Sequence, residues 1–314
     1  MRRASESGGV SIFEGESTEQ IRAAYEQAFP ELPPEHARSL VEHVATEPGE
    51  PMDEREFLRH VDEGRIYPGW VGYHTVDGKK LWGAELLARL YTGDGFACAE
   101  RFKDSATRRD MWPEISKSVM SKSAQVVKHV PEHLAVSFNV CGDLLDEGDR
   151  FVEFIAALQK ESGTPDRTIC LETVEQIESL LNNGRSQTLR KCEKKKVRFF
   201  VDDLGAKKKD KRSARSQETD EKNNADRLLE QLTTIVEIYG IKFCAAVTSS
   251  AQKGNARLES CIKKGKRHGV SRYIAEGSEH YPINNQMFLS LQRLQDKYEK
   301  KIELLVQGPV FRIM

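Results

Sequence analysis

Apolar and polar positions alternate along this chain in two different ways. From Ile66 onward, short apolar runs are separated by longer segments in which apolar residues recur every three or four positions. The short runs are typical of buried strands and the longer segments are typical of amphipathic helices. The predicted strands are 66–76, 80–90, 134–140, 167–173, 198–204, 241–247, 270–276 and 303–311. The predicted helices include 111–129, 149–162, 174–183, 226–239, 254–268 and 283–299.

Eight strands with interposed helices over about 250 residues have the length and rhythm of a (β/α)8 barrel. A doubly wound sheet fits the same rhythm. However, no glycine-rich phosphate-binding fingerprint follows the first strand, which lowers that option. We therefore predict an α/β fold of the TIM-barrel-like (β/α)8 type.

The first 52 residues differ in character from the rest of the chain. Residues 1–16 are polar and rich in Gly and Ser, and we expect them to be disordered. Between Ser17 and Val44 the apolar residues return at helical spacing, interrupted by prolines. Because residues 1–52 carry ten acids and four bases, we separate an acidic, partly disordered N-terminal helical segment from a barrel that covers 53–314.

One segment interrupts the rhythm of the barrel. Residues 206–225 contain no Val, Leu, Ile or aromatic residue, so they cannot bury a face. We predict a low-complexity insertion there.

The overall charge is balanced. Lys and Arg number 48 and Asp and Glu number 49 among 314 residues, so the formal net charge is −1. A protein that binds a nucleic acid polymer usually carries a basic excess, and we expect no such partner. Residues 190–215 form a local exception with twelve bases and four acids, which we interpret as a solvated loop near an anionic substrate.

Neither end of the chain nor its interior predicts a membrane or secretory protein. No apolar run follows the N-terminal residues, and no stretch approaches the roughly 20 apolar residues that span a bilayer. The six cysteines form no CxxC pair. We therefore expect a cytoplasmic protein without membrane association.

Acids and amides recur at the predicted strand ends, which meet at one mouth in a barrel. Taken alone, each such residue is usually a helix cap or a solvated turn. Together these carboxylates would repel unless cations neutralised them, and hard oxygen ligands favour Mg²⁺ or Mn²⁺. A carboxylate site for two metals suits phosphodiester hydrolysis. The residues concerned are Glu85, Asn139, Glu172, Glu175, Asp202, Asp203, Glu276, Glu279 and Gln307, with Lys242 in the sixth strand.

Seven short blocks occur in a recognisable order on these strands. They are GAELLARL from Gly83, FNVC from Phe138, LETVE from Leu171, DDLG from Asp202, KFC from Lys242, AEGSE from Ala275 and QGP from Gln307. From about Asp53 to the C-terminus the chain thereby resembles the EAL-domain family of cyclic-di-GMP phosphodiesterases. The resemblance implies a barrel that opens cyclic-di-GMP to linear pGpG with a two-metal Mg²⁺ or Mn²⁺ site.

The resemblance also implies a role for each matching residue. Glu85, Asn139, Glu172 and Asp202 would bind one metal, and Asp202 would bridge to the second metal beside Asp203. Glu276 would act as general base, and Lys242 would orient the attacking water. Arg89 would bind a substrate phosphate, and Gln307, Glu175 and Glu279 would support the site.

The sequence departs from the family pattern in several places. The signature triplet is Glu85-Leu86-Leu87, and an insertion beginning at Ala206 replaces the loop that normally follows the paired aspartates. Weak turnover is therefore as compatible with the sequence as full activity. The alternatives are a degenerate member that binds cyclic-di-GMP or a protein partner without turnover, and a phosphodiesterase for another nucleotide. A homodimer is also left open.

Overall fold

The computed structural model describes most of the first two thirds of the chain and separate elements of the last third. The described ranges are 16–41, 50–76, 80–163, 168–173, 183–201, 243–248, 259, 262–263, 266, 272–276, 283–298, 303–307 and 310–311. Within these ranges, no helix is both long enough and apolar enough to cross a membrane.

Helices and strands alternate from the third strand onward. The helices are α1 Glu16–Ala28, α2 Pro34–Ser39, α3 Glu54–Asp62, α4 Ala99–Arg108, α5 Trp112–Val127, α6 Gly142–Asp146, α7 Asp149–Glu161, α9 Asn183–Glu193 and α12 Asn285–Lys297. The strands are β1 Ile66–Thr75, β2 Leu81–Tyr91, β3 Phe96–Ala97, β4 Ala135–Val140, β5 Ile169–Thr173, β6 Arg198–Val201, β7 Phe243–Thr248, β8 Arg272–Glu276, β9 Ile283–Asn284, β10 Glu303–Gln307 and β11 Val310–Phe311.

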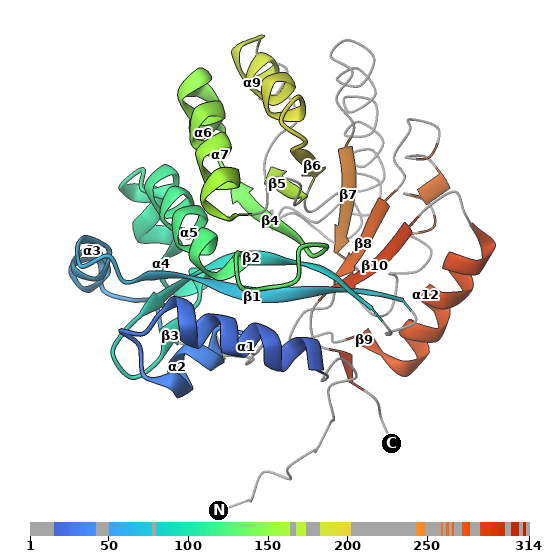
Figure 1. The fold of residues 1–314 in the computed structure, drawn as a ribbon, viewed down its shortest axis with the longest axis horizontal. Coiled ribbons are helices and arrows are strands. Elements are labelled where there is room, and N and C mark those ends of the chain that lie inside the picture. The colour runs from blue at the N-terminus through green and yellow to red at the C-terminus, as the bar shows by residue number, and fades with distance from the viewer. Residues whose placement is uncertain are drawn as a thin grey trace, which may run out of the picture.

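The main sheet closes on itself. Its order is β1-β10-β8-β7-β6-β5-β4-β2-β3, and β1 also pairs with β2. Because β3 pairs only with β2 among the described strands, the other eight form a complete ring. Figure 1 shows helices α5, α6, α7, α9 and α12 arranged around the outside of these strands. The predicted TIM-barrel-like fold is thus confirmed, and closure excludes an open doubly wound sheet.

The first strand runs against its neighbours. β1 is antiparallel to both β2 and β10, whereas the other neighbouring strands of the ring are parallel. A parallel pair needs a crossover of about a dozen residues, and only residues 76–80 separate β1 from β2. The short connection therefore forces a hairpin, in which the Thr75 N–H donates to the Lys80 carbonyl at 3.0 Å.

The predicted elements agree with the described ones to within a few residues. The structure adds helices α4, α6 and α9, whose apolar spacing is weak in the sequence. The predicted helices 174–182 and 226–239 and the insertion 206–225 lie outside the described residues, and only isolated residues of 254–268 are described.

A small hydrophobic cluster fills the inside of the ring. Tyr73, Cys170, Phe200 and Leu305 are each fully buried, and partly buried Trp82 packs against them. These residues come from strands on opposite sides of the ring, yet the Tyr73 and Phe200 rings lie 6.4 Å apart. The interior below the strand ends is therefore packed with side chains and is not a pore.

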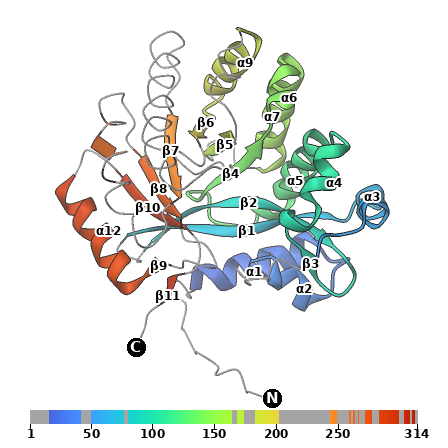
Figure 2. The same ribbon diagram turned by 180° about the vertical axis from the view of Figure 1, so that it is seen from behind.

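The N-terminal helices share one hydrophobic core with the barrel. Phe29, which follows α1, meets the Tyr67 ring edge-on at 5.1 Å between centroids. The carbonyl of Leu40, just after α2, accepts the N–H of Trp70 in β1 at 2.7 Å. In both Figure 1 and Figure 2, α1 lies alongside the β1–β2 hairpin. The division between residues 1–52 and 53–314 stays a prediction.

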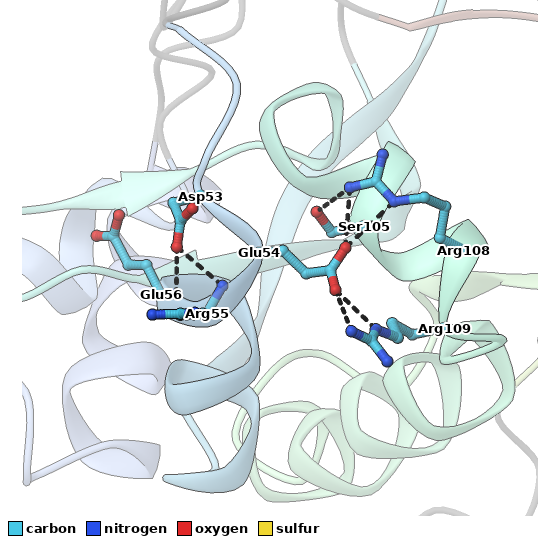
Figure 3. A network of polar contacts seen from close by, with 7 residues as sticks. All are labelled: Asp53, Glu54, Arg55, Glu56, Ser105, Arg108 and Arg109. Atoms are coloured by element: carbon cyan, nitrogen blue, oxygen red, sulfur yellow. Dashed lines mark hydrogen bonds and ion pairs between the residues drawn. The ribbon is translucent and has the colours of Figure 1, made fainter.

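Helices α3 and α4 are joined by a carboxylate that binds two arginines (Figure 3). Glu54 accepts hydrogen bonds from Arg109, with Nε at 2.8 Å, and from Arg108, with Nη2 at 3.0 Å. These hydrogen bonds from Arg109 and Arg108 lower the pKa of Glu54. The preceding Asp53 caps α3 by accepting the N–H of Arg55 at 2.9 Å, so adjacent acids start the helix and dock it.

The buried position of Phe29 generates a stability prediction. Replacing Phe29 by Ala should lower the free energy of unfolding by about 3–5 kcal/mol, because it leaves a cavity against Tyr67. Gln27→Ala is the matched control, because Gln27 is exposed on α1 and its loss should cost about 0.5 kcal/mol or less. Urea denaturation measures both values. Equal effects would show that α1 does not pack on the barrel.

Candidate functional site

Three of the predicted metal ligands lie next to one another on neighbouring strands. Glu85 of β2 is in register with Ser137 of β4, and Asn139 of β4 is in register with Glu172 of β5. Side chains alternate between the two faces of a strand, so all four residues share the face inside the ring. The carboxylates are buried, with Glu85 7% and Glu172 2% exposed.

Asn139 contacts Glu85 directly and keeps an oxygen in reserve. Its amide Nδ2 donates to Glu85 Oε1 at 2.5 Å. Its Oδ1 is buried and has no hydrogen-bond partner among the described residues. A buried acceptor without a partner costs about 1–3 kcal/mol, which is an unusual expense for a stable interior. A hard cation beside the Glu85 carboxylate would satisfy this oxygen.

Tyr73 links Glu172 to β4. Its hydroxyl donates to Glu172 Oε1 at 2.5 Å and lies 2.7 Å from Ser137 Oγ. Burial raises the pKa of Tyr73 well above its usual value, and the negative charges of Glu172 and Glu85 raise it further. The hydroxyl therefore remains a donor at neutral pH and holds the Glu172 carboxylate in a fixed position.

The backbone places two more predicted residues on the same side of the ring. Gln307 of β10 is in register with Tyr73 and also with Glu276, the last residue of β8. Glu276 in turn is in register with Thr248, the last residue of β7. The carboxyl ends of β7, β8 and β10 therefore adjoin the strand that carries Tyr73.

Arg89 lies further along β2 than the carboxylates. It follows Glu85 by four residues, which corresponds to about 13 Å of extended strand on the same face. Its Nη1 donates to the carbonyl of Ala88 at 3.3 Å. The structure thus separates the predicted phosphate-binding arginine from the predicted metal ligands by a distance suited to a ligand larger than one ion.

Five predicted site residues lie outside the described part of the chain, so their roles stay predictions. These are Glu175, Asp202, Asp203, Lys242 and Glu279. Asp202 directly follows the last described residue of β6, at the carboxyl end. Among the described residues, no group of three or more His, Cys, Asp and Glu side chains could hold a metal ion by itself. A metal would use the Asn139 amide, and Asp202 would have to complete the site.

The direction of β7 bears on Lys242. β7 begins one residue later, at Phe243, and runs parallel to β8. Lys242 therefore precedes the amino end of the strand, about 20 Å of extended chain from Thr248, the residue that pairs with Glu276. The described residues of β7 include no acid, base or histidine. This strand direction gives no support to Lys242 as a residue of the mouth.

The described part of the basic run does not lie where the sequence suggested. Arg190 and Lys191 belong to α9, and exposed Lys194, Lys195 and Lys196 form the turn before β6. That turn adjoins the amino end of β6, whereas the acids lie at carboxyl ends. The prediction of a loop near an anionic substrate is wrong for residues 190–198.

Sequence reasoning missed Tyr73 and Ser137. Both are polar groups on the inward face of predicted strands, and that alternation was the available signal. One sequence does not reveal which strands face each other across a barrel.

Comparisons with known proteins agree with this architecture. The family model described as EAL domain matches residues 54–220, more than half of the chain. No curated protein matches the sequence. Among solved structures, an EAL domain protein from Listeria monocytogenes is similar with a TM-score of 0.60 at 15% identity, and the match covers 83% of this chain and 92% of that one.

Two further structures contain a nucleotide. The YkuI protein of Bacillus subtilis, in complex with substrate c-di-GMP and calcium, matches with a TM-score of 0.55 at 16% identity over 82% of this chain and 56% of that one. The FimX EAL domain of Pseudomonas aeruginosa, bound to c-di-GMP, matches with a TM-score of 0.58 at 10% identity over 82% of this chain and 94% of that one. At these identities the likeness shows a shared fold.

The hydrogen bonds of Tyr73 generate a second prediction. Tyr73→Phe should lower the free energy of unfolding by about 1–3 kcal/mol, because the buried Glu172 carboxylate loses a donor. Tyr91→Phe is the control, because the Tyr91 hydroxyl donates to the Gly93 carbonyl at an exposed site and should cost only about 0.5–1 kcal/mol. Chemical denaturation at neutral pH compares them, and an equal or smaller loss for Tyr73→Phe would contradict the assigned contact.

Proposed function

Because this chain belongs to the EAL domain family, we propose that it binds cyclic-di-GMP at the mouth of its barrel and hydrolyses it slowly to linear pGpG. The observation that carries the proposal is the contact between Glu85 and Asn139 beside Glu172. These are three buried oxygen-bearing side chains at neighbouring strand ends, and one of their oxygens has no partner among the described residues. This donor set suits a hard divalent cation.

Mg²⁺ or Mn²⁺ is the proposed cofactor. Glu85, Asn139, Glu172 and Asp202 would hold it, and Asp203 would adjoin a second ion. When bound, such ions lower the pKa of water and neutralise charge on the phosphate oxygens. The protein itself contributes the fixed orientation of these ligands, through the hydrogen bonds of Tyr73 to Glu172 and of Asn139 to Glu85.

The other residues act on the substrate and on water. Glu276 takes the proton as the water oxygen attacks phosphorus, and the bond from phosphorus to the ribose 3′ oxygen breaks. The 3′ oxygen then gains a proton, so pGpG retains a 5′ phosphate. Arg89 binds a phosphate of the dinucleotide, since a guanidinium can donate two hydrogen bonds to one phosphate. Gln307, Glu175 and Glu279 support this arrangement.

Turnover is proposed to be slow for a reason that lies in β7. A water-orienting lysine would have to come from the carboxyl end of this strand, and Lys242 precedes its amino end. The same observation favours a second candidate function, which is binding of cyclic-di-GMP without hydrolysis. The two candidates share the nucleotide site and differ only in whether a water molecule attacks.

The metal site can be tested without measuring turnover. Mn²⁺ at 100 times its dissociation constant should raise the melting temperature by roughly 5 °C, because it binds only the folded chain. Asn139→Leu should abolish this shift, since it removes the Asn139 oxygen from the site. Each variant is compared with its own metal-free form, and chelation with EDTA is the control. A full Mn²⁺ shift in Asn139→Leu would contradict the proposed ligand set.

Hydrolysis is tested by following pGpG formation with Mn²⁺. Glu276→Gln should lower the rate by roughly 100-fold or more while leaving nucleotide affinity within about 2-fold, because a general base acts in the chemical step. Lys242→Ala is the matched comparison, and the direction of β7 predicts that it changes the rate little. Binding by the wild-type chain without any pGpG supports the second candidate. Unchanged turnover in Glu276→Gln would show that the assigned base is wrong.

A further inference from the structure

The N-terminal helices pack on the face of the β1–β2 hairpin that carries Arg89. Tyr67 and Arg89 are direct register partners, and opposite residues of an antiparallel pair share a face. The register is continuous from Ile66–Leu90 to Tyr73–Gly83, so the same face carries Glu85. Phe29 contacts the Tyr67 ring on that face, which places the end of α1 next to the register partner of Arg89.

Tyr25 of α1 is a buried polar group whose hydroxyl is unused within the described structure. It lies one helical turn before Phe29, and their rings meet edge-on at 5.8 Å. Its side chain is fully buried, and its hydroxyl has no hydrogen-bond partner among the described residues. Burial raises the pKa of Tyr25, and the positive charge of Arg89 opposes that rise, so the two groups are near neighbours.

Gly69 of β1 leaves room for the stem of Arg89. Gly69 is the register partner of Leu87, which makes Arg89 its diagonal neighbour. A Cβ at position 69 would lie 2.7 Å from Arg89 Cγ and 3.0 Å from Arg89 Nε. Separations below 3.0 Å do not occur between real Cβ atoms and their neighbours, so any other residue at this position would move the arginine.

These observations describe a place for an anion. Arg89 is only partly buried, and its guanidinium has donors beyond the one that Ala88 uses. An unsatisfied hydroxyl in an interior is destabilising by about 1–3 kcal/mol. A phosphate oxygen bound to Arg89 would accept the Tyr25 hydrogen bond that the described structure does not supply.

We infer that Tyr25 and Arg89 together form a phosphate subsite, and that Gly69 is the gap through which Arg89 reaches it. The inference rests on the proposed function, because the phosphate is one of those in cyclic-di-GMP. It makes α1, which lies outside the residues matched by the family model, a working part of the nucleotide site. Tyr25 is a further binding residue, and Gly69 is a positioning residue that acts through Arg89.

A double-mutant cycle tests the role of Gly69. Cyclic-di-GMP affinity is measured by calorimetry with Ca²⁺ as the cation for wild type, Gly69→Ala, Arg89→Ala and the double variant. Arg89→Ala should weaken binding roughly 10- to 100-fold, the range expected for a charged hydrogen bond. Gly69→Ala should weaken binding comparably in the wild-type chain and by less than about 2-fold when Arg89 is absent, because the Ala methyl then displaces nothing.

The melting temperatures of the same four proteins report the contact without any nucleotide. Gly69→Ala should lower the melting temperature only when Arg89 is present. Gly95→Ala is the matched control, because a Cβ there meets no atom within 4 Å, and it should change neither affinity nor melting temperature. An equal effect of Gly69→Ala with and without Arg89 would overturn the positioning role.

Tyr25→Phe tests the hydroxyl alone. It should weaken cyclic-di-GMP binding by roughly 2- to 10-fold, the range for a neutral hydrogen bond, without lowering the melting temperature. Unchanged affinity, or weaker affinity together with a lower melting temperature, would overturn the subsite. If the wild-type chain binds no cyclic-di-GMP, the proposed function and the subsite both fail. The melting-temperature cycle would still show whether Gly69 accommodates Arg89.

Discussion

Closure of the ring by β1 is the constraint on which the rest of the structure depends. β1 is the only ring strand among those described that runs against both neighbours, and it joins β2 to β10. Closure carries Tyr73 into the interior, where it contacts Phe200 from the opposite side and binds Glu172. Without β1, the sheet would have two free edges and the two buried glutamates would lose their shared enclosure.

The hairpin also explains why the N-terminal helices are part of the core. β1 pairs with β10 only at Tyr73–Thr75, so its first half has one edge without a strand among the described residues. Leu40 supplies a carbonyl for Trp70 at that edge, and Phe29 covers the Tyr67 ring. A hairpin provides no crossover helix of its own, and α1 and α2 cover the surface that such a helix would otherwise bury.

The sequence predicted the parts of the site that depend on local alternation. Glu85, Asn139 and Glu172 each end or interrupt an apolar strand, and strands that run parallel bring such ends together. Tyr73 and the packing of α1 depend instead on which elements face each other across the barrel. A single sequence shows that α1 has an apolar face, but it does not show what that face buries.

Lys242 illustrates a different limit. Its block of letters resembles a family motif, but a match of letters does not include the position of a residue along its strand. β7 begins after Lys242, so the lysine precedes the wrong end of the strand for contact with Glu276. Strand boundaries are the least certain part of a sequence-based prediction, and a shift of a few residues moves a side chain by a large part of the barrel height.

Binding and turnover depend on different parts of this barrel. The oxygen donors of Glu85, Asn139 and Glu172 lie on β2, β4 and β5, in the half of the ring whose side chains are tightly packed. Attack by water would draw on the carboxyl ends of β7 and β8, where Thr248 pairs with Glu276. Because β7 offers no ionisable side chain, loss of catalysis would leave the metal ligands on the other strands in place. A chain of this kind can retain nucleotide recognition after its rate of hydrolysis has fallen, since the two halves of the ring are held together by Tyr73 and not by the substrate.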